Sequence, residues 1–170
     1  MNNYFNNLLS LLNKEADLIE VSARVVDWRY KSNQRLILDT GKPFEKRVEP
    51  TPFKGEPKSC YQNCFQLLGK KNLYYCEGFA THNSYPLAFA HAWLVNDTGE
   101  VIDPTWWDVA KFANSVYLGV AFNEEFVREI ATKTQKYGII ENDFMIDHKI
   151  KREGFPSHAL SSKFHPAVLR

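Results

Sequence analysis

His91-Ala92-Trp93-Leu94-Val95 and Val101-Ile102-Asp103-Pro104-Thr105 lie on either side of the turn signal Asp97-Thr98-Gly99. Apolar runs that flank an Asp-Thr-Gly turn are typical of a β-hairpin, so we expect a strand over 89–96 and another that begins at 100 and stops at Pro104. Antiparallel pairing would then bring Asp103 within a few residues of a position opposite His91. An imidazole and a carboxylate in apolar strands each need a polar partner, and each can serve the other.

A cysteine segment, Ser59-Cys60-Tyr61-Gln62-Asn63-Cys64, precedes this hairpin. Pro57 and Ser59 predict the start of a helix, which Gly69 closes, and Ser59 is the expected cap. Cys60 would then occupy the first turn, where unpaired amides and the helix dipole favour a thiolate. Cys64 and Cys76 are interpreted as small buried residues of the core.

The remaining chain predicts a mixture of helices and strands. Spaced leucines indicate an amphipathic helix over 3–20, whereas 21–38 fits either a strand or a continued helix. Residues 39–58 are rich in Pro and Gly and are expected to form a loop. Further elements are predicted as a strand over 73–81, a short helix near 106–114, a strand over 116–120, and a helix that Asn123 caps and that ends near Tyr137. The layout predicts an α+β domain in which an antiparallel meander is flanked by helices.

Bulk properties limit the classes of function. The 170 residues predict a single domain, with an N-terminal helical extension (1–50), a catalytic core (55–140) and a basic, weakly patterned tail (145–170). A formal charge of +1 gives no reason to expect a nucleic-acid partner. Three cysteines do not suggest a disulfide framework. With neither a signal-peptide pattern nor a membrane-spanning run, we expect a cytoplasmic protein with no membrane partner, and the sequence sets no oligomeric state.

The motifs resemble those of the papain-like cysteine hydrolase superfamily, most closely its transglutaminase-like branch. The resemblance covers roughly residues 55–120, and the matching pieces are Ser59–Asn63, Tyr75-Cys76-Glu77-Gly78-Phe79-Ala80, His91–Val95 and Gly99–Thr105. It implies a papain/transglutaminase-like core, in which the helix that carries the cysteine packs on an antiparallel sheet. It also implies that Cys60 is the nucleophile, His91 the base and Asp103 the acid that orients the base. No glutamine stands just upstream of Cys60 as an oxyanion donor, so the second donor is unassigned.

These observations leave several functions open. The first is a thiol-dependent hydrolase or acyltransferase that acts on amide bonds of a peptide or protein substrate and uses no metal or cofactor. Tyr61, Trp93 and Trp106 are expected to bind the substrate, and Trp107 is a further candidate for the cleft. The second is a non-catalytic binding module whose basic tail, near Lys149–Arg152, contacts an acidic partner. The third is a metal site formed by Cys60, Cys64 and Cys76 with His82 or His91.

Overall fold

The computed structural model describes residues 3–24, 27–82 and 85–166, and these segments combine helices with an antiparallel sheet. The α+β class predicted from the sequence is therefore confirmed. In the described segments the sheet has five strands in the order β1-β5-β2-β3-β4. The strands are β1 (Lys42–Phe44), β2 (Tyr74–His82), β3 (Tyr85–Val95), β4 (Val101–Ile102) and β5 (Val116–Ala121). The meander β2-β3-β4 is thus extended by β5, which returns to the free side of β2.

The β3–β4 hairpin forms as the sequence predicts. Leu94 pairs with Ile102 and Val95 with Val101 in antiparallel register. Gly99 has a φ of +81°, a conformation that costs glycine little, and it ends the turn between the strands. Since β4 stops at Ile102, Asp103 is the first residue beyond the ladder, and continuing the register would place it opposite Trp93.

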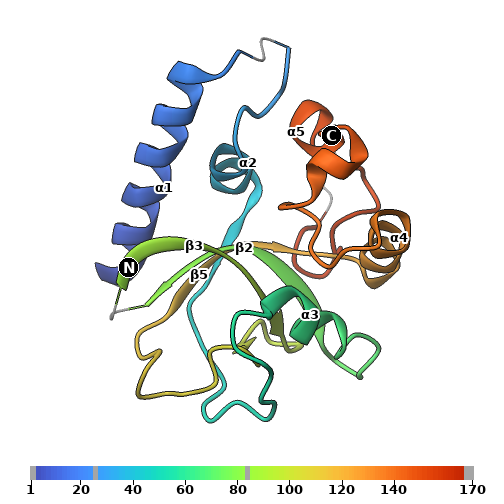
Figure 1. Ribbon diagram of the computed structural model, residues 1–170. Helices are drawn as coiled ribbons and strands as arrows, with labels where there is room; N and C mark the ends of the chain where they lie inside the picture. Colours follow the sequence, from blue (N-terminus) through green and yellow to red (C-terminus); the bar gives the residue numbers. More distant parts are fainter. Residues whose placement is uncertain (1–2, 25–26, 83–84, 167–170) are drawn as a thin grey trace.

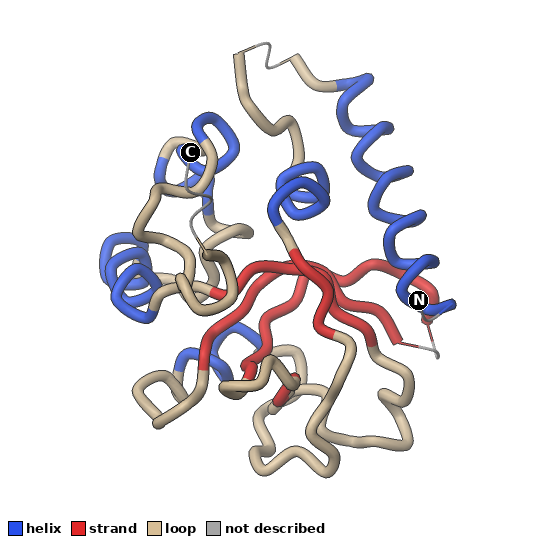
Figure 2. The backbone as a smooth tube through the Cα atoms, turned by 180° about the vertical axis from the view of Figure 1, so that it is seen from behind, coloured by secondary structure: helices blue, strands red, loops and turns tan. Residues whose placement is uncertain are grey.

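Helices lie on both sides of the sheet. Figures 1 and 2 show α1 and α2 on one side, with α3 and the loops around it on the other. The helices are α1 (Asn3–Ser22), α2 (Asn33–Thr40), α3 (Cys60–Phe65), α4 (Glu124–Thr134), the 3₁₀-helix η1 (Asp143–Ile146) and α5 (Lys149–Glu153). The predicted helix over 3–20 is confirmed as α1, and the undecided segment 21–38 contains most of α2. None of the described helices has both the length and the apolar character that crossing a bilayer requires.

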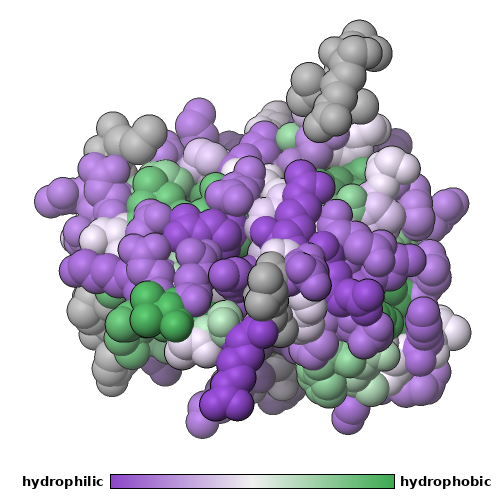
Figure 3. Space-filling model, turned by 90° about the horizontal axis from the view of Figure 1, so that it is seen from above, coloured by the Kyte–Doolittle hydropathy of each residue, from purple (hydrophilic) through white to green (hydrophobic). Residues whose placement is uncertain are grey.

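Alternation along β3 divides the core between the two faces of the sheet. Ala92 and Leu94 belong to a large cluster that includes buried leucines of α1 and α2. Trp93 and Val95 point to the opposite face, where Phe44 of β1 and Tyr117 of β5 pack on Trp93. The face of the molecule that is seen from above in Figure 3 is mostly hydrophilic, with separate hydrophobic patches. His91 has the same parity as Trp93, so it lies on the aromatic face.

Several boundaries differ from the sequence predictions. The expected loop 39–58 contains the edge strand β1, which pairs with β5. The segment near 106–114 forms successive turns in place of the predicted helix. The helix that starts at Cys60 ends at Phe65, well before Gly69. In α4 the left-handed residue Gln135 ends the helix before Tyr137. A left-handed terminal residue need not be glycine, which is why the glycine signal placed the end of α4 too late.

Candidate active site

Asp103 is a buried, extensively hydrogen-bonded residue at the centre of the candidate site. Its side chain is fully buried, and its Oδ2 lies 2.8 Å from Nε2 of His91, which is itself only 3% exposed. The Tyr117 hydroxyl donates to the same oxygen at 2.9 Å. The backbone amides of Thr105 and Trp106 both donate to Oδ1 at 2.9 Å. Because both carboxylate oxygens accept hydrogen bonds, the carboxylate can hold the imidazole in one orientation.

The electrostatics of the pair favour charge on both partners. Burial acts against the Asp103 carboxylate, but the neighbouring His91 and the two backbone amides keep the pKa of Asp103 below its ordinary value. Burial likewise opposes an imidazolium, yet Asp103, followed by the contact with Cys60, raises the pKa of His91 to about 10. A protonated His91 at neutral pH is the partner that a thiolate requires.

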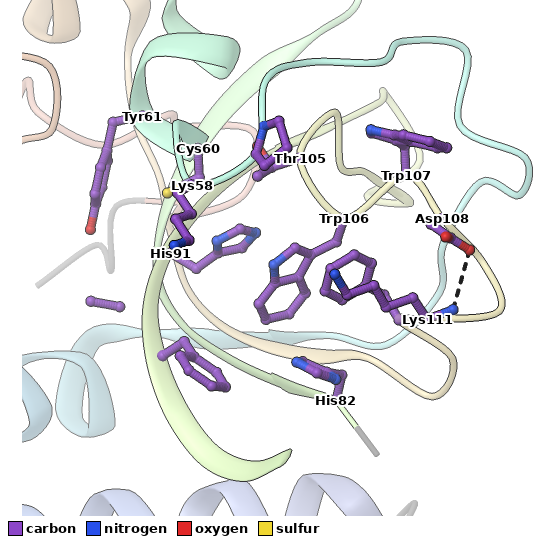
Figure 4. Close-up of a pocket in the computed structure, with 14 residues that line it drawn as sticks. Lys58, Cys60, Tyr61, His82, His91, Thr105, Trp106, Trp107, Asp108 and Lys111 are labelled. Atoms are coloured by element: carbon purple, nitrogen blue, oxygen red, sulfur yellow. Dashed lines mark hydrogen bonds between the residues drawn. The ribbon is translucent and has the colours of Figure 1, made fainter. Parts of the chain in front are cut away.

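Cys60 reaches this pair from the first residue of α3. It is half-buried, whereas the other free cysteines, Cys64 and Cys76, are fully buried. Cys60 and the His91 ring line the same pocket, and an interaction with the Cys60 side chain is one of the influences that raise the pKa of His91. Since Nε2 of that ring is engaged by Asp103, Nδ1 is the nitrogen left for the sulfur. Figure 4 shows Cys60 and His91 on the same pocket, so the structure brings the three predicted residues together.

The short helix α3 is fixed by Asn63 and not by the predicted cap. Ser59 stands at the cap position, but its side chain makes no capping bond there, and its hydroxyl instead donates to the Pro57 carbonyl at 3.4 Å. The buried Asn63 amide donates to the Glu56 carbonyl and to the Thr105 hydroxyl, both at 2.8 Å, and accepts from the Glu56 amide at 3.1 Å. Asn63 thereby ties the helix of the nucleophile to the segment that carries the acid.

A pocket of about 510 Å³ opens beside the three residues. Trp106 and Tyr61, both predicted to contact the substrate, line it, and so does Trp107. The Trp106 indole stacks on His91 with ring centroids 4.2 Å apart and planes inclined by 19°. This stacking covers one face of the imidazole, and the exposed parts of the rings give the pocket an apolar wall.

Trp93, which the sequence analysis expects to bind the substrate, lies in the core and not in the pocket lining. Trp93 is fully buried, lies outside the pocket lining and packs on Tyr117 with ring centroids 5.1 Å apart. Its indole extends across Gly119, where a Cβ atom would come within 2.5 Å of the ring. Trp93 follows His91 by two residues on the same face of β3, so it supports the site from within the core.

Several residues of the site carried no sufficient signal in the sequence. Tyr117 is a residue of β5, and that strand reaches Asp103 only because β5 pairs with β2. The remaining pocket residues that the sequence analysis did not assign to it are Pro57, Lys58, His82, Phe89, Ala90, Thr105, Asp108, Lys111 and Phe112. Asn63 was the detectable case, because Asn is unfavourable inside a helix and needs hydrogen-bond partners where it is buried.

The structure separates two cysteines of the metal hypothesis. Within the described ranges, no group of at least three His, Cys, Asp or Glu side chains is arranged to hold an ion. Cys64 belongs to the large core cluster that also contains leucines of α1 and α2, whereas Cys76 belongs to the second cluster, with Trp93. Burial raises the pKa of both thiols well above the ordinary value, which disfavours the thiolates that zinc binds.

The arrangement can therefore support nucleophilic chemistry by a sulfur whose proton is shared with an oriented imidazole. No family model, curated protein or solved structure gave a significant match to the chain.

Proposed function

We propose that this protein is a thiol-dependent hydrolase or acyltransferase that acts on an amide bond of a peptide or protein. The observation that carries the proposal is the buried His91–Asp103 pair, joined at 2.8 Å, in contact with the half-buried Cys60 at a pocket. A structural ion pair alone would not require a thiol beside it or an opening to solvent.

In the proposed reaction the Cys60 thiolate attacks the carbonyl carbon of the amide, and the carbonyl oxygen takes up the negative charge. The tetrahedral intermediate collapses as His91 gives its proton to the departing amine, which leaves a thioester on Cys60. Neutral His91 then removes a proton from water or from an amine as this second nucleophile attacks the thioester. Water releases a carboxylic acid, an amine gives a new amide, and either route restores the thiolate and the imidazolium.

Residues of this chain have separate parts in that sequence. Asp103 keeps His91 oriented and compensates its positive charge in both acyl-transfer steps. The Cys60 backbone amide, at the first turn of α3, is outside the i to i−4 ladder of the helix and is the proposed first donor to the oxyanion. A cysteine at the start of a helix, with His on a strand and Asp directly after the neighbouring strand of an antiparallel sheet, also supports assignment to a papain/transglutaminase-like core.

Alkylation kinetics test the proposal, because Cys64 and Cys76 are buried and the native chain should react at Cys60. We expect iodoacetamide to label one cysteine at pH 6.5 at least 10-fold faster than it labels a free thiol, whose pKa is about 8.5. C60A should remove the labelling. H91A should slow it to the rate of an ordinary thiol. Amide cleavage or transfer would then be sought with peptide libraries, and a thioester on Cys60 by mass spectrometry.

C64A is the matched control, since it removes a buried thiol from the same helix and should leave the labelling rate unchanged. Equal labelling of C60A and wild type would overturn the assignment of the nucleophile. An ordinary rate at Cys60 that does not respond to H91A, in a folded protein, would favour the non-catalytic binding module.

A further inference from the structure

The geometry points to a carboxylate-binding subsite at the Lys111 end of the pocket, which receives a ligand whose apolar part lies along the aromatic wall. This inference rests on the proposed function only in identifying that ligand as the substrate, because binding itself needs no reaction at Cys60. It therefore narrows the substrate to amides with a carboxylate beyond an apolar group.

The wall that leads away from the nucleophile is aromatic throughout. His91 stacks on Trp106, and Trp106 stacks on Phe112 with centroids 5.2 Å apart and planes inclined by 4°. Phe89 stands at 90° to Trp106 and is stacked on His82. Rings in these orientations offer flat apolar surface next to the reacting groups, which suits an aromatic or extended aliphatic group.

Lys111 places a positive charge at the end of this wall. Figure 4 shows its side chain running back along the rings toward Trp106, and its Nζ lies 5.3 Å from the centroid of the Phe112 ring. Burial, followed by the charges of His91 and Lys111, keeps the pKa of His82 below its ordinary value, so the Lys111 charge acts inside the pocket. Lys111 is an exposed residue, so its ammonium gives a solvent-accessible charge at the mouth of the apolar pocket, where it attracts an anion.

The other charges that face the pocket leave a positive balance at neutral pH. Asp108 is the acidic residue of the lining, and its Oδ1 already accepts the amides of Ala110 and Lys111. Lys58 supplies a further positive charge beside Cys60. The neutral form of His82 can add a hydrogen-bond donor at the far end. A carboxylate complements this set, whereas an ammonium would be repelled at both ends.

Peptides with the same apolar group test the subsite in the C60A chain, where no reaction interferes. Acetyl-Phe-Glu-amide carries the carboxylate on a side chain, acetyl-Phe-Gln with a free C-terminus carries it on the backbone, and acetyl-Phe-Gln-amide carries none. Titration calorimetry or NMR shifts would give the three dissociation constants. We expect at least one charged peptide to bind about three- to fivefold more tightly than the neutral one, the range for a solvent-accessible ion pair. The charged peptide that binds more tightly shows whether the subsite takes a side-chain or a C-terminal carboxylate.

In the C60A chain, K111Q should lower the affinity of the charged peptides to that of the neutral one. Where Lys111 is retained, added salt should reduce the difference in affinity between the charged and the neutral peptides. K133Q removes an exposed lysine of α4 and should preserve the difference. Equal affinities for the three peptides, or a preference that survives K111Q, would overturn the subsite and leave the proposed function intact. Conversely, selective binding in C60A combined with ordinary thiol reactivity in wild type would retain the subsite and overturn the chemistry.

Discussion

At the scale of single residues, the site depends most on a carboxylate that has no contact with solvent. Asp103 is fully buried, and its hydrogen bonds come from a strand, from its own loop and from His91. Substitution of Asp103 by Asn should be poorly tolerated. The NH2 group of the Asn side chain would be a donor, and it would face partners that are themselves hydrogen-bond donors.

D103N should therefore impair both stability and reactivity. We expect a loss of about 3–5 kcal/mol in the free energy of unfolding, the cost of breaking a buried ion pair. The rate of amide turnover should fall by up to about 10⁴-fold, because an Asn would hold His91 in the wrong tautomer. Urea unfolding and the kinetics of whichever peptide is cleaved would measure the two effects. Y117F is the control, since it removes a hydroxyl bond to the charged carboxylate worth about 1.5–3 kcal/mol and leaves the His91–Asp103 pair in place. Turnover by D103N within threefold of wild type would rule out the orienting role of Asp103.

At the scale of elements, the position of α3 is decided by Asn63. The helix is only six residues long and has no side-chain cap at Ser59, so its own hydrogen bonds cannot fix it. Asn63 joins it to the Glu56 backbone and to Thr105, two residues after the acid. Gly55 allows this contact, because a Cβ there would stand 2.4 Å from the Asn63 side chain.

N63A should thus displace the nucleophile as well as weaken the fold. It leaves buried partners unsatisfied, for a cost of about 1–3 kcal/mol, and should slow labelling of Cys60 at least severalfold. G55A should cause the same two changes by pushing the amide away. Q62A, which alters an exposed residue of the same helix, is the control for both measurements. Normal labelling by a destabilised N63A protein would show that Asn63 acts on stability alone.

A second connection between elements joins β2 to the chain after α4. Glu77 is fully buried in β2 and accepts hydrogen bonds from the Tyr75 hydroxyl and from the amides of Ile139 and Ile140. Burial is the largest influence and raises the pKa of Glu77 from 4.5 to about 7. The folded state therefore binds a proton that the unfolded state has already lost between these two values.

It follows that the stabilising effect of Glu77 protonation is complete below pH 4.5 and is lost as the pH rises through about 7. At 1.36 kcal/mol per pKa unit, this loss is at most about 3 kcal/mol. E77Q cannot titrate, so urea unfolding at pH values from 5 to 8 should show a smaller fall in stability than in wild type. E129Q, at an exposed position of α4, should retain the wild-type slope. Parallel slopes in E77Q and wild type would contradict the raised pKa.

At the scale of the whole molecule, local sequence signals predicted how adjacent segments of the chain pair. They did not predict which segments distant in the sequence lie side by side. The Asp-Thr-Gly turn predicted the hairpin, and the hairpin brought His91 to Asp103, so the core of the candidate site followed from a single turn. The position of β5 beside β2 and the addition of β1 at the edge depend on packing between distant segments. Tyr117 and the burial of Trp93 follow from that strand order, which no local pattern specifies. The extension 1–50 also had no visible link to the core, yet it supplies β1 and the buried residues Leu8 and Leu36.

The placement of the tail, over its described residues 145–166, also depends on contacts between distant segments. Its sequence is weakly patterned, yet it is hydrogen-bonded to the end of β5. The Ser161 amide donates to the Ala121 carbonyl at 2.9 Å, and the Ala121 amide donates to Nε2 of His165 at 3.0 Å. Only an unprotonated Nε2 can accept that bond, and burial, followed by the charge of Lys42, lowers the pKa of His165 to about 4. The bond therefore holds the tail in place at neutral pH.

Acid should release this end of the chain before it unfolds the core. A histidine whose folded pKa lies below its unfolded value of 6.5 contributes stability above pH 6.5, and that contribution is lost as the pH falls toward about 4. H165Q keeps a carbonyl acceptor for Ala121 without titrating, so limited proteolysis between pH 7 and pH 4.5 should expose the tail in wild type more than in H165Q. H158Q changes an exposed histidine of the same segment and should behave as wild type. If H165Q and wild type become sensitive at the same pH, the tail is held by its apolar contacts, with Phe164 against Phe44 and Tyr74 as the principal ones.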